Sequence, residues 1–134
     1  MPVETATEAW CTEIVGGVEA PCVVRELLTD RLGDTTSEET LHDLHLLATE
    51  LVTNAVLHAH VGDAGRLAVR VITGPDAVRV SVTDPGAETT PEVQDIDPSV
   101  PGGMGLFLVE QISADWGVHR MPGGASEVWF ELAA

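Results

Sequence analysis

Three short segments of the sequence carry residue types that could act together on a bound anion. In the first, Glu50, Asn54 and His58 follow one another at intervals of four residues. This spacing places their side chains on one ridge of a helix. A carboxylate there can accept a proton from an attacking hydroxyl, and a carboxamide oxygen can bind magnesium. The pattern also fits an ordinary solvated helix face.

The second segment is an apolar run that ends at Asp84 and continues into Pro85 and Gly86. An Asp at the end of a strand lies at the edge of a sheet, where its carboxylate can accept a hydrogen bond from an exocyclic amine. Gly86 has no Cβ, so a flat ring could approach the backbone closely. The alternative is a simple strand-terminating turn, because Asp, Pro and Gly are common turn residues.

The third segment is a glycine-rich stretch that opens an apolar run with helical spacing. Its backbone amides are free to bind phosphate, and the helix dipole favours negative charge there. The residues concerned are Gly102, Gly103, Met104, Gly105 and Leu106. The stretch is not a P-loop, which requires a lysine that this chain lacks. A glycine-rich connection without a ligand is the alternative.

Hydrophobic periodicity predicts the elements that must position these segments. Helices are expected over 19–32, from a capping box at Thr36-Ser37-Glu38-Glu39 to Gly62, and over 102–115. Strands are expected over 9–16, 66–73, 77–83, 116–120 and 126–132. Residues 84–101 contain four prolines, and we expect no regular element there. This order predicts an α+β two-layer sandwich, with helices covering one face of a mixed sheet.

Composition and charge narrow the class of protein. The 134 residues suit a single domain over 1–134, and no apolar run is long enough to span a membrane. The net charge of -16 argues against binding to nucleic acid, which needs clustered basic residues. Without a recognisable secretory signal, a cytoplasmic location is expected. Cys11 and Cys22 are therefore expected to be reduced residues of the core.

The order of the three segments resembles the GHKL ATP-binding fold shared by gyrase, Hsp90 and histidine kinases. The motifs are Glu-x-x-x-Asn in a long helix, Asp-x-Gly after two strands, and Gly-x-Gly at a helix start. The stretches 50–56, 103–109 and 128–132 are most similar to the stand-alone anti-sigma-factor serine/threonine kinases. A histidine-kinase catalytic domain fits less well, because the residues before the Glu50 helix cannot also supply a phosphoacceptor hairpin.

This resemblance implies a site for ATP and Mg2+. Glu50 would be the general base, Asn54 would hold magnesium, and Asp84 would bind the adenine amino group. Gly86, Gly103 and Gly105 would let the backbone approach the nucleotide. The implied function is phosphorylation of a serine or threonine on an antagonist protein, with a sigma factor as second partner. Homodimerisation is compatible with this function. The alternative is a regulatory binding module that uses nucleotide without kinase activity.

The chain also departs from the family pattern at three places. Ala87 stands where a second glycine is usual, and residues 84–101 contain no Lys or Arg. A small hydroxyl residue commonly precedes the final Val-Trp, where this chain has Glu127, with Ser126 one place earlier. Since strand side chains alternate between faces, Ser126 and Glu127 cannot both face the site. A nucleotide contact from this strand is therefore not assigned.

Overall fold

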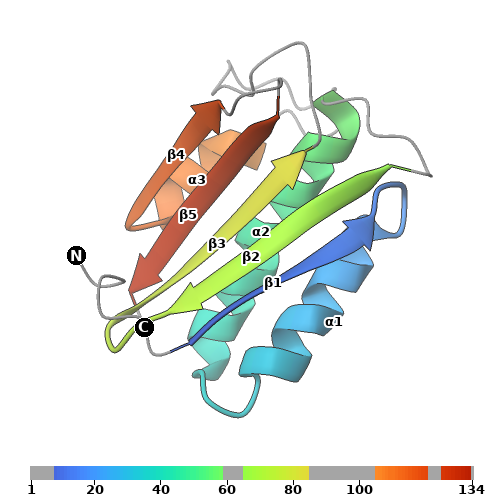
Figure 1. The fold of residues 1–134 in the computed structure, drawn as a ribbon. Helices are drawn as coiled ribbons and strands as arrows, with labels where there is room; N and C mark the ends of the chain where they lie inside the picture. Colours follow the sequence, from blue (N-terminus) through green and yellow to red (C-terminus); the bar gives the residue numbers. More distant parts are fainter. Residues whose placement is uncertain (1–7, 59–64, 85–104, 121–124, 134) are drawn as a thin grey trace.

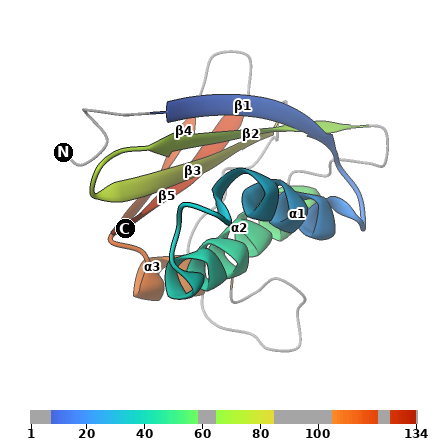
Figure 2. The ribbon, with the colours of Figure 1, turned by 90° about the horizontal axis from the view of Figure 1, so that it is seen from below.

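The computed structural model describes residues 8–58, 65–84, 105–120 and 125–133, which form two layers. The five strands form one sheet in the order β1-β2-β3-β5-β4 (Figure 1). Viewed along the sheet, the three helices lie on one side of it (Figure 2). The predicted α+β two-layer sandwich is confirmed. The elements are β1 (Glu8–Val15), α1 (Ala20–Leu32), α2 (Glu38–His58), β2 (Arg66–Thr73), β3 (Ala77–Asp84), α3 (Gly105–Ile112), β4 (Asp115–Arg120) and β5 (Ser126–Ala133).

Each strand pairing in this sheet is antiparallel, whereas the sequence analysis expected a mixed sheet. The number of helices between two successive strands determines whether the second strand runs parallel or antiparallel to the first. The pair α1 and α2 carries the chain away from the end of β1 and back again, so β2 runs opposite to β1. The single helix α3 carries the chain to the far end of the sheet, so β4 runs with β3. The β4–β5 hairpin then sets β5 antiparallel between them.

The hydrophobic core fills the space between the sheet and α2. Alternate residues along the central strands point to the helix side, as the period of two in a strand requires. All are at most 5% exposed: Leu67, Val69, Val71, Val78, Val80, Val82, Val128, Phe130 and Leu132. They pack against the equally buried stripe of Leu44, Leu47, Ala48 and Leu51 on α2. This packing holds α2 firmly against the sheet.

The start of α2 differs from the predicted capping box. The Thr40 N–H donates to the Ser37 hydroxyl over 3.1 Å, and that hydroxyl donates to the Thr40 Oγ1 over 3.0 Å. Because Glu38 is the first helical residue, Ser37 takes the capping position, and the prediction of Thr36 and Glu39 was wrong by one residue. The helix ends at His58, and residues 59–64 lie outside the described chain. No helix in the described chain is both long and apolar enough to cross a membrane.

The face of the sheet opposite the helices carries an ordered polar cluster. The Arg79 Nη2 lies 2.8 Å from the Glu131 Oε1, and the Arg79 Nε donates to the same oxygen over 3.0 Å. The guanidinium carbon also lies 4.1 Å from the Trp129 ring centroid. The Trp129 indole rests on Gly117, where a Cβ would come within 2.9 Å of the ring. These contacts tie β3, β5 and β4 together.

Both cysteines are free and exposed, so their predicted place in the core was wrong. Cys11 lies on the helix-free face of β1, because Trp10, Thr12 and Ile14 take the helix side. Cys22 lies on the solvent side of α1, where Arg25 Nη2 donates to its Sγ over 3.2 Å.

Candidate functional site

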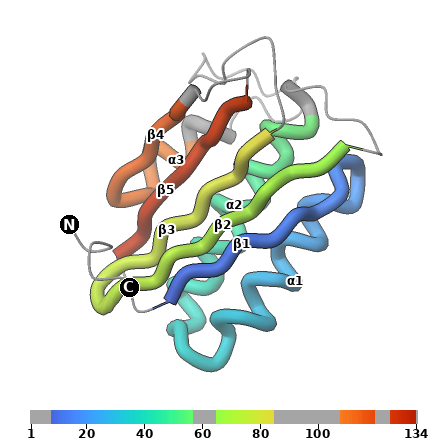
Figure 3. Tube along the Cα trace, viewed as in Figure 1, coloured from blue at the N-terminus to red at the C-terminus, as the bar shows by residue number. Residues whose placement is uncertain are grey.

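Three polar side chains from separate parts of the chain lie at one end of the sandwich. There β3 ends, β5 begins and α2 approaches its last turn (Figures 1 and 3). Asp84, the last residue of β3, is the register partner of Ser126, the first residue of β5. Asn54 lies one turn before the end of α2, which packs on both strands. The two-helix connection before β2 brings α2 back to this end.

These three side chains are buried although they are polar. Asn54 is 6%, Asp84 2% and Ser126 0% exposed. Buried polar atoms normally have a hydrogen-bond partner, and leaving one without costs about 1–3 kcal/mol. Among the described residues, neither the Asn54 Nδ2 nor the Ser126 Oγ has a partner. Two unsatisfied groups at the same end of the sandwich as a buried carboxylate are expected where a polar ligand completes the hydrogen bonds.

The Asn54 carboxamide can serve a ligand in two ways. Rotation about its terminal bond exchanges the amide nitrogen and oxygen, so the same position can present a donor or an acceptor. An amide oxygen together with phosphate and water oxygens is a ligand set that Mg2+ accepts. The residue therefore fits the predicted magnesium ligand.

Glu50 lies one turn before Asn54 on α2 and is half-buried. Burial raises the pKa of this carboxyl above its ordinary value of 4.5, because the charged form loses hydration. Once ionised, a carboxylate with a raised pKa is a stronger proton acceptor. The position and the electrostatics of Glu50 therefore suit the predicted general base.

Ser126 is a candidate site residue that the sequence analysis left unassigned. It lies on the helix side of β5, where Val128 and Phe130 are also buried. Glu127 is on the opposite face, where its register partners are Thr83 and His119. The sequence could have indicated this placement. Ser126 alternates with the apolar residues 128, 130 and 132, so all four lie on the same face of the strand.

The structure describes the glycine-rich segment only from Gly105 onward. Gly105 and Leu106 are the first residues of α3, and α3 packs against α2. Their phosphate contacts stay predictions. Gly86, Gly102, Gly103 and Met104 lie outside the described residues, as do Ala87 and the rest of the loop.

A family model described as the histidine kinase-like ATPase domain matches residues 23–131. The chain belongs to this family. The match runs from α1 into β5 and therefore includes all the candidate site residues.

Curated relatives of this histidine kinase-like ATPase domain include two serine-protein kinases. RsbW of Listeria monocytogenes serotype 4a is 34% identical over 91 residues, which cover 59% of this chain and 58% of the relative. RsbW of Bacillus subtilis strain 168 is 31% identical over 108 residues, which cover 72% and 66%. The chain thus spans about three fifths of the length of the curated relatives it matches.

A solved structure shares the fold of this histidine kinase-like ATPase domain. It is a chain in the crystal structure of the SiaB-SiaC complex from Pseudomonas aeruginosa. The TM-score is 0.62 at 13% sequence identity, with 93% of this chain and 89% of that chain covered. At this identity the likeness concerns the fold alone.

Proposed function

We propose that this chain binds ATP with Mg2+ and phosphorylates a serine or threonine of a partner protein. One observation carries the proposal: buried Asn54 and Ser126 have unpartnered polar atoms at the same end of the sandwich as the Asp84 carboxylate. Membership in the histidine kinase-like ATPase family and the similarity to serine-protein kinases support it.

Each site residue has a distinct role in binding. The Asp84 carboxylate accepts a hydrogen bond from the adenine amine, and the Ser126 hydroxyl supplies a second polar group beside it. Asn54 holds Mg2+, which when bound neutralises part of the phosphate charge. The amides from Gly102 to Leu106 face the phosphates at the start of α3, and Gly86 lets the backbone approach the base.

Glu50 acts on the acceptor hydroxyl. As the serine or threonine oxygen forms its bond to the γ-phosphorus and the bond to ADP breaks, Glu50 takes the proton that the hydroxyl releases. Half-burial keeps this carboxylate weakly solvated and therefore basic. Its position one turn from Asn54 places the base on the same helix as the magnesium ligand.

The resemblance to anti-sigma-factor kinases supports two protein partners. An antagonist protein would accept the phosphoryl group, and a sigma factor would be bound and released in the cytoplasm. Because the chain spans only part of the length of its curated relatives, these partners are part of the proposal.

A regulatory binding module is the second candidate, and the charge of residues 84–101 favours it. This stretch contains no Lys or Arg and includes Glu88, Glu92, Asp95 and Asp97. A cation at the transferring phosphoryl group can contribute orders of magnitude in rate. In this version the chain binds nucleotide as a regulatory module and has little or no kinase activity.

Labelled ATP separates the two candidates. The full chain is incubated with γ-labelled ATP, Mg2+ and candidate antagonists, and ATP binding is measured by calorimetry in parallel. A kinase transfers label to an antagonist, Glu50→Gln loses that transfer, and Glu39→Gln on the exposed first turn of α2 keeps it. The regulatory module is supported if the chain binds ATP tightly but transfers no label to any antagonist, whether or not the antagonist keeps its basic surface residues. Absence of ATP binding contradicts both.

A further inference from the structure

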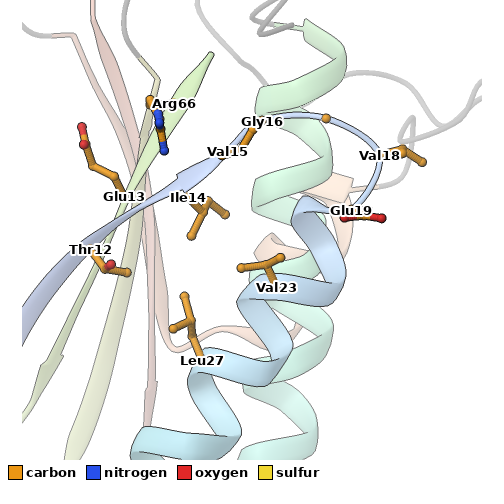
Figure 4. A pocket seen from close by; sticks show the side chains of 11 residues that line it. Thr12, Glu13, Ile14, Val15, Gly16, Val18, Glu19, Val23, Leu27 and Arg66 are labelled. Atoms are coloured by element: carbon orange, nitrogen blue, oxygen red, sulfur yellow. The ribbon is translucent and has the colours of Figure 1, made fainter. Parts of the chain in front are cut away.

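One face of the sheet has no helix of the described chain against it, because α1, α2 and α3 all lie on the other side (Figure 2). Side chains alternate between the two faces along each strand. On β1, Ile14 points toward Val23 of α1, whereas Glu13 points away from the helices (Figure 4). The strand register extends this alternation to the whole sheet. The open face consists of the odd-numbered residues of β1, β3, β4 and β5 and the even-numbered residues of β2.

The open face mixes apolar side chains with charged ones. A sheet face in contact with water is normally polar. Here Val15 is 47% exposed, and Ala9 and Cys11 on the same strand are also exposed. Ala68 and Ile72 of β2 are half-buried beside them. A face of this composition is suited to packing against a second sheet.

The charges on the open face are divided between its two halves. On one side of the central strand β3, the exposed Arg66 and Arg70 of β2 outnumber the single carboxylate of Glu13 on β1. On the other side lie the carboxylates of Glu127 on β5 and Asp115 on β4. Within the described chain none of these five side chains forms an ion pair. One half is therefore positive and the other negative.

A two-fold axis parallel to the strands makes the open face complementary to itself. With the axis in front of β3 and between two such faces, β2 of one copy lies over β5 of the other. Residues aligned across the sheet stay aligned between the copies, and Ala68 and Glu127 are both aligned with Thr83. Glu127 of the second copy therefore falls over Ala68, between Arg66 and Arg70. The contact occurs twice, as an isologous interface requires.

The charges also select this orientation over the alternative. An axis perpendicular to the strands would lay β2 on β2, so that arginine would face arginine. With the axis parallel to the strands, Glu13 falls opposite His119, so two carboxylates do not meet there. Arg79 falls opposite its own counterpart, but each is neutralised by Glu131 at 2.8 Å. Charge complementarity thus favours a second copy in one orientation.

We propose that two copies of this chain pack through their open faces as a symmetric β-sandwich. Glu127 of each copy binds Arg66 and Arg70 of the other, and the half-buried Ile72 becomes covered. At about 0.15 M salt the Debye length is about 8 Å, so the net charge of -16 is screened more than the contacts inside the interface. The candidate nucleotide site lies on the helix side, so this interface does not depend on the proposed kinase activity.

Copies with reversed charges test the interface in sedimentation velocity experiments. The wild-type chain should shift from monomer to dimer as its concentration rises. Glu127→Arg places arginine against arginine, and the double variant Arg66→Glu, Arg70→Glu places carboxylates against a carboxylate. Each variant alone should therefore dimerise at least about tenfold more weakly than wild type. An equimolar mixture of the two variants should regain the dimer, because both contacts of the mixed dimer again join opposite charges.

Glu39→Arg, on the exposed first turn of α2, is the matched control for Glu127→Arg. Both substitutions make the chain less negative by the same amount, but Glu39 lies on the helix side. Glu39→Arg should dimerise at least as well as wild type. Circular dichroism of each variant checks that the fold is kept.

The two native cysteines give a second measurement that needs no substitution. Both are free and exposed, but Cys11 is on the open face and Cys22 is on α1. In the proposed dimer Cys11 falls opposite Gly117 of the second copy. Alkylation of Cys11 should therefore slow as the dimer forms, whereas alkylation of Cys22 should keep its rate.

Three results would overturn the proposal. The first is a wild-type chain that stays monomeric up to about 1 mM. The second is a dimer that Glu127→Arg leaves unchanged, or one that the mixture of folded variants does not restore, because another surface would then hold it. The third is alkylation of Cys11 at the same rate in the dimer and the monomer.

Discussion

Asp84 and Ser126 face each other across the β3–β5 pairing, one at the last position of its strand and the other at the first. Both are at most 2% exposed, on the side of the sheet that the helices cover. A carboxylate acceptor and a hydroxyl that can donate or accept thus lie together. This pair can recognise an amine beside a ring nitrogen.

The Asp84 carboxylate should select adenine over guanine. The guanine carbonyl would face it with a like lone pair, and a site with an unmade hydrogen bond discriminates strongly. ATP and ADP should therefore bind, GTP should bind much more weakly, and Asp84→Asn should lose at least about tenfold in ATP affinity. Asp76→Asn, at the exposed turn before β3, is the control. Equal ATP and GTP affinities in calorimetry would rule out this role.

Ser126→Ala should separate folding from binding. In the absence of nucleotide it removes an unpartnered hydroxyl, so the free energy of unfolding in urea should stay equal or rise by up to about 1 kcal/mol. Nucleotide affinity should fall about threefold to tenfold, the value of one hydrogen bond. A large loss of stability without nucleotide would instead show that Ser126 holds the fold.

Glu50→Gln should spare nucleotide binding and lower phosphoryl transfer by the ~10²–10⁴ typical of a lost general base. Since burial raises the pKa of Glu50 above 4.5, the carboxyl is protonated over a wider acidic range than an ordinary Glu. The rate should fall as the pH falls through that pKa, and the residual rate of Glu50→Gln should lack this limb. Asn54→Ala should weaken Mg2+-dependent binding instead. Loss of binding by a folded Glu50→Gln would contradict the assigned role.

Gly117→Ala should destabilise the sheet by about 1–3 kcal/mol, because the new Cβ would come within 2.9 Å of the Trp129 indole. The ring would have to leave its place under Arg79, which should also change the tryptophan fluorescence. In a Trp129→Leu background the same substitution should cost clearly less in denaturant titrations. Equal costs in both backgrounds would mean that the indole is not the obstacle.

His45 should make stability depend on pH. Burial first, and then the positive charge of Arg25, lower its pKa below the ordinary 6.5, while Thr29 Oγ1 lies 2.9 Å from its Nε2. Between the folded pKa and 6.5 the unfolded chain binds a proton that the folded chain does not, so stability rises with pH across this window. Urea titrations across it should show a smaller rise for His45→Gln than for wild type. His119→Gln, at an exposed position of β4, should keep the full rise.

The local elements were predictable because each has a periodicity of its own. The stripe from Leu44 to Leu51 predicted α2, and the alternation in 66–73 and 77–83 predicted β2 and β3 within one residue. The strand order was not predictable in this way, because the insertion of β5 beside β3 depends on contacts between distant residues. The same limit left Ser126 unassigned, since its role depends on its register with Asp84. The burial of Cys11 was mispredicted because the sequence alone does not show which face of the edge strand β1 packs against the helices.

The place of β5 in the sheet has a consequence for how the chain folds during synthesis. Of the eight elements in the described residues it is made last, yet it is an interior strand with β3 on one side and β4 on the other. In a nascent chain, β1, β2 and β3 are therefore complete while the edge of β3 that will pair with β5 still has no partner strand. The sheet can close only after residues 126–133 have left the ribosome, so the partly made chain exposes a strand edge that invites aggregation or a chaperone.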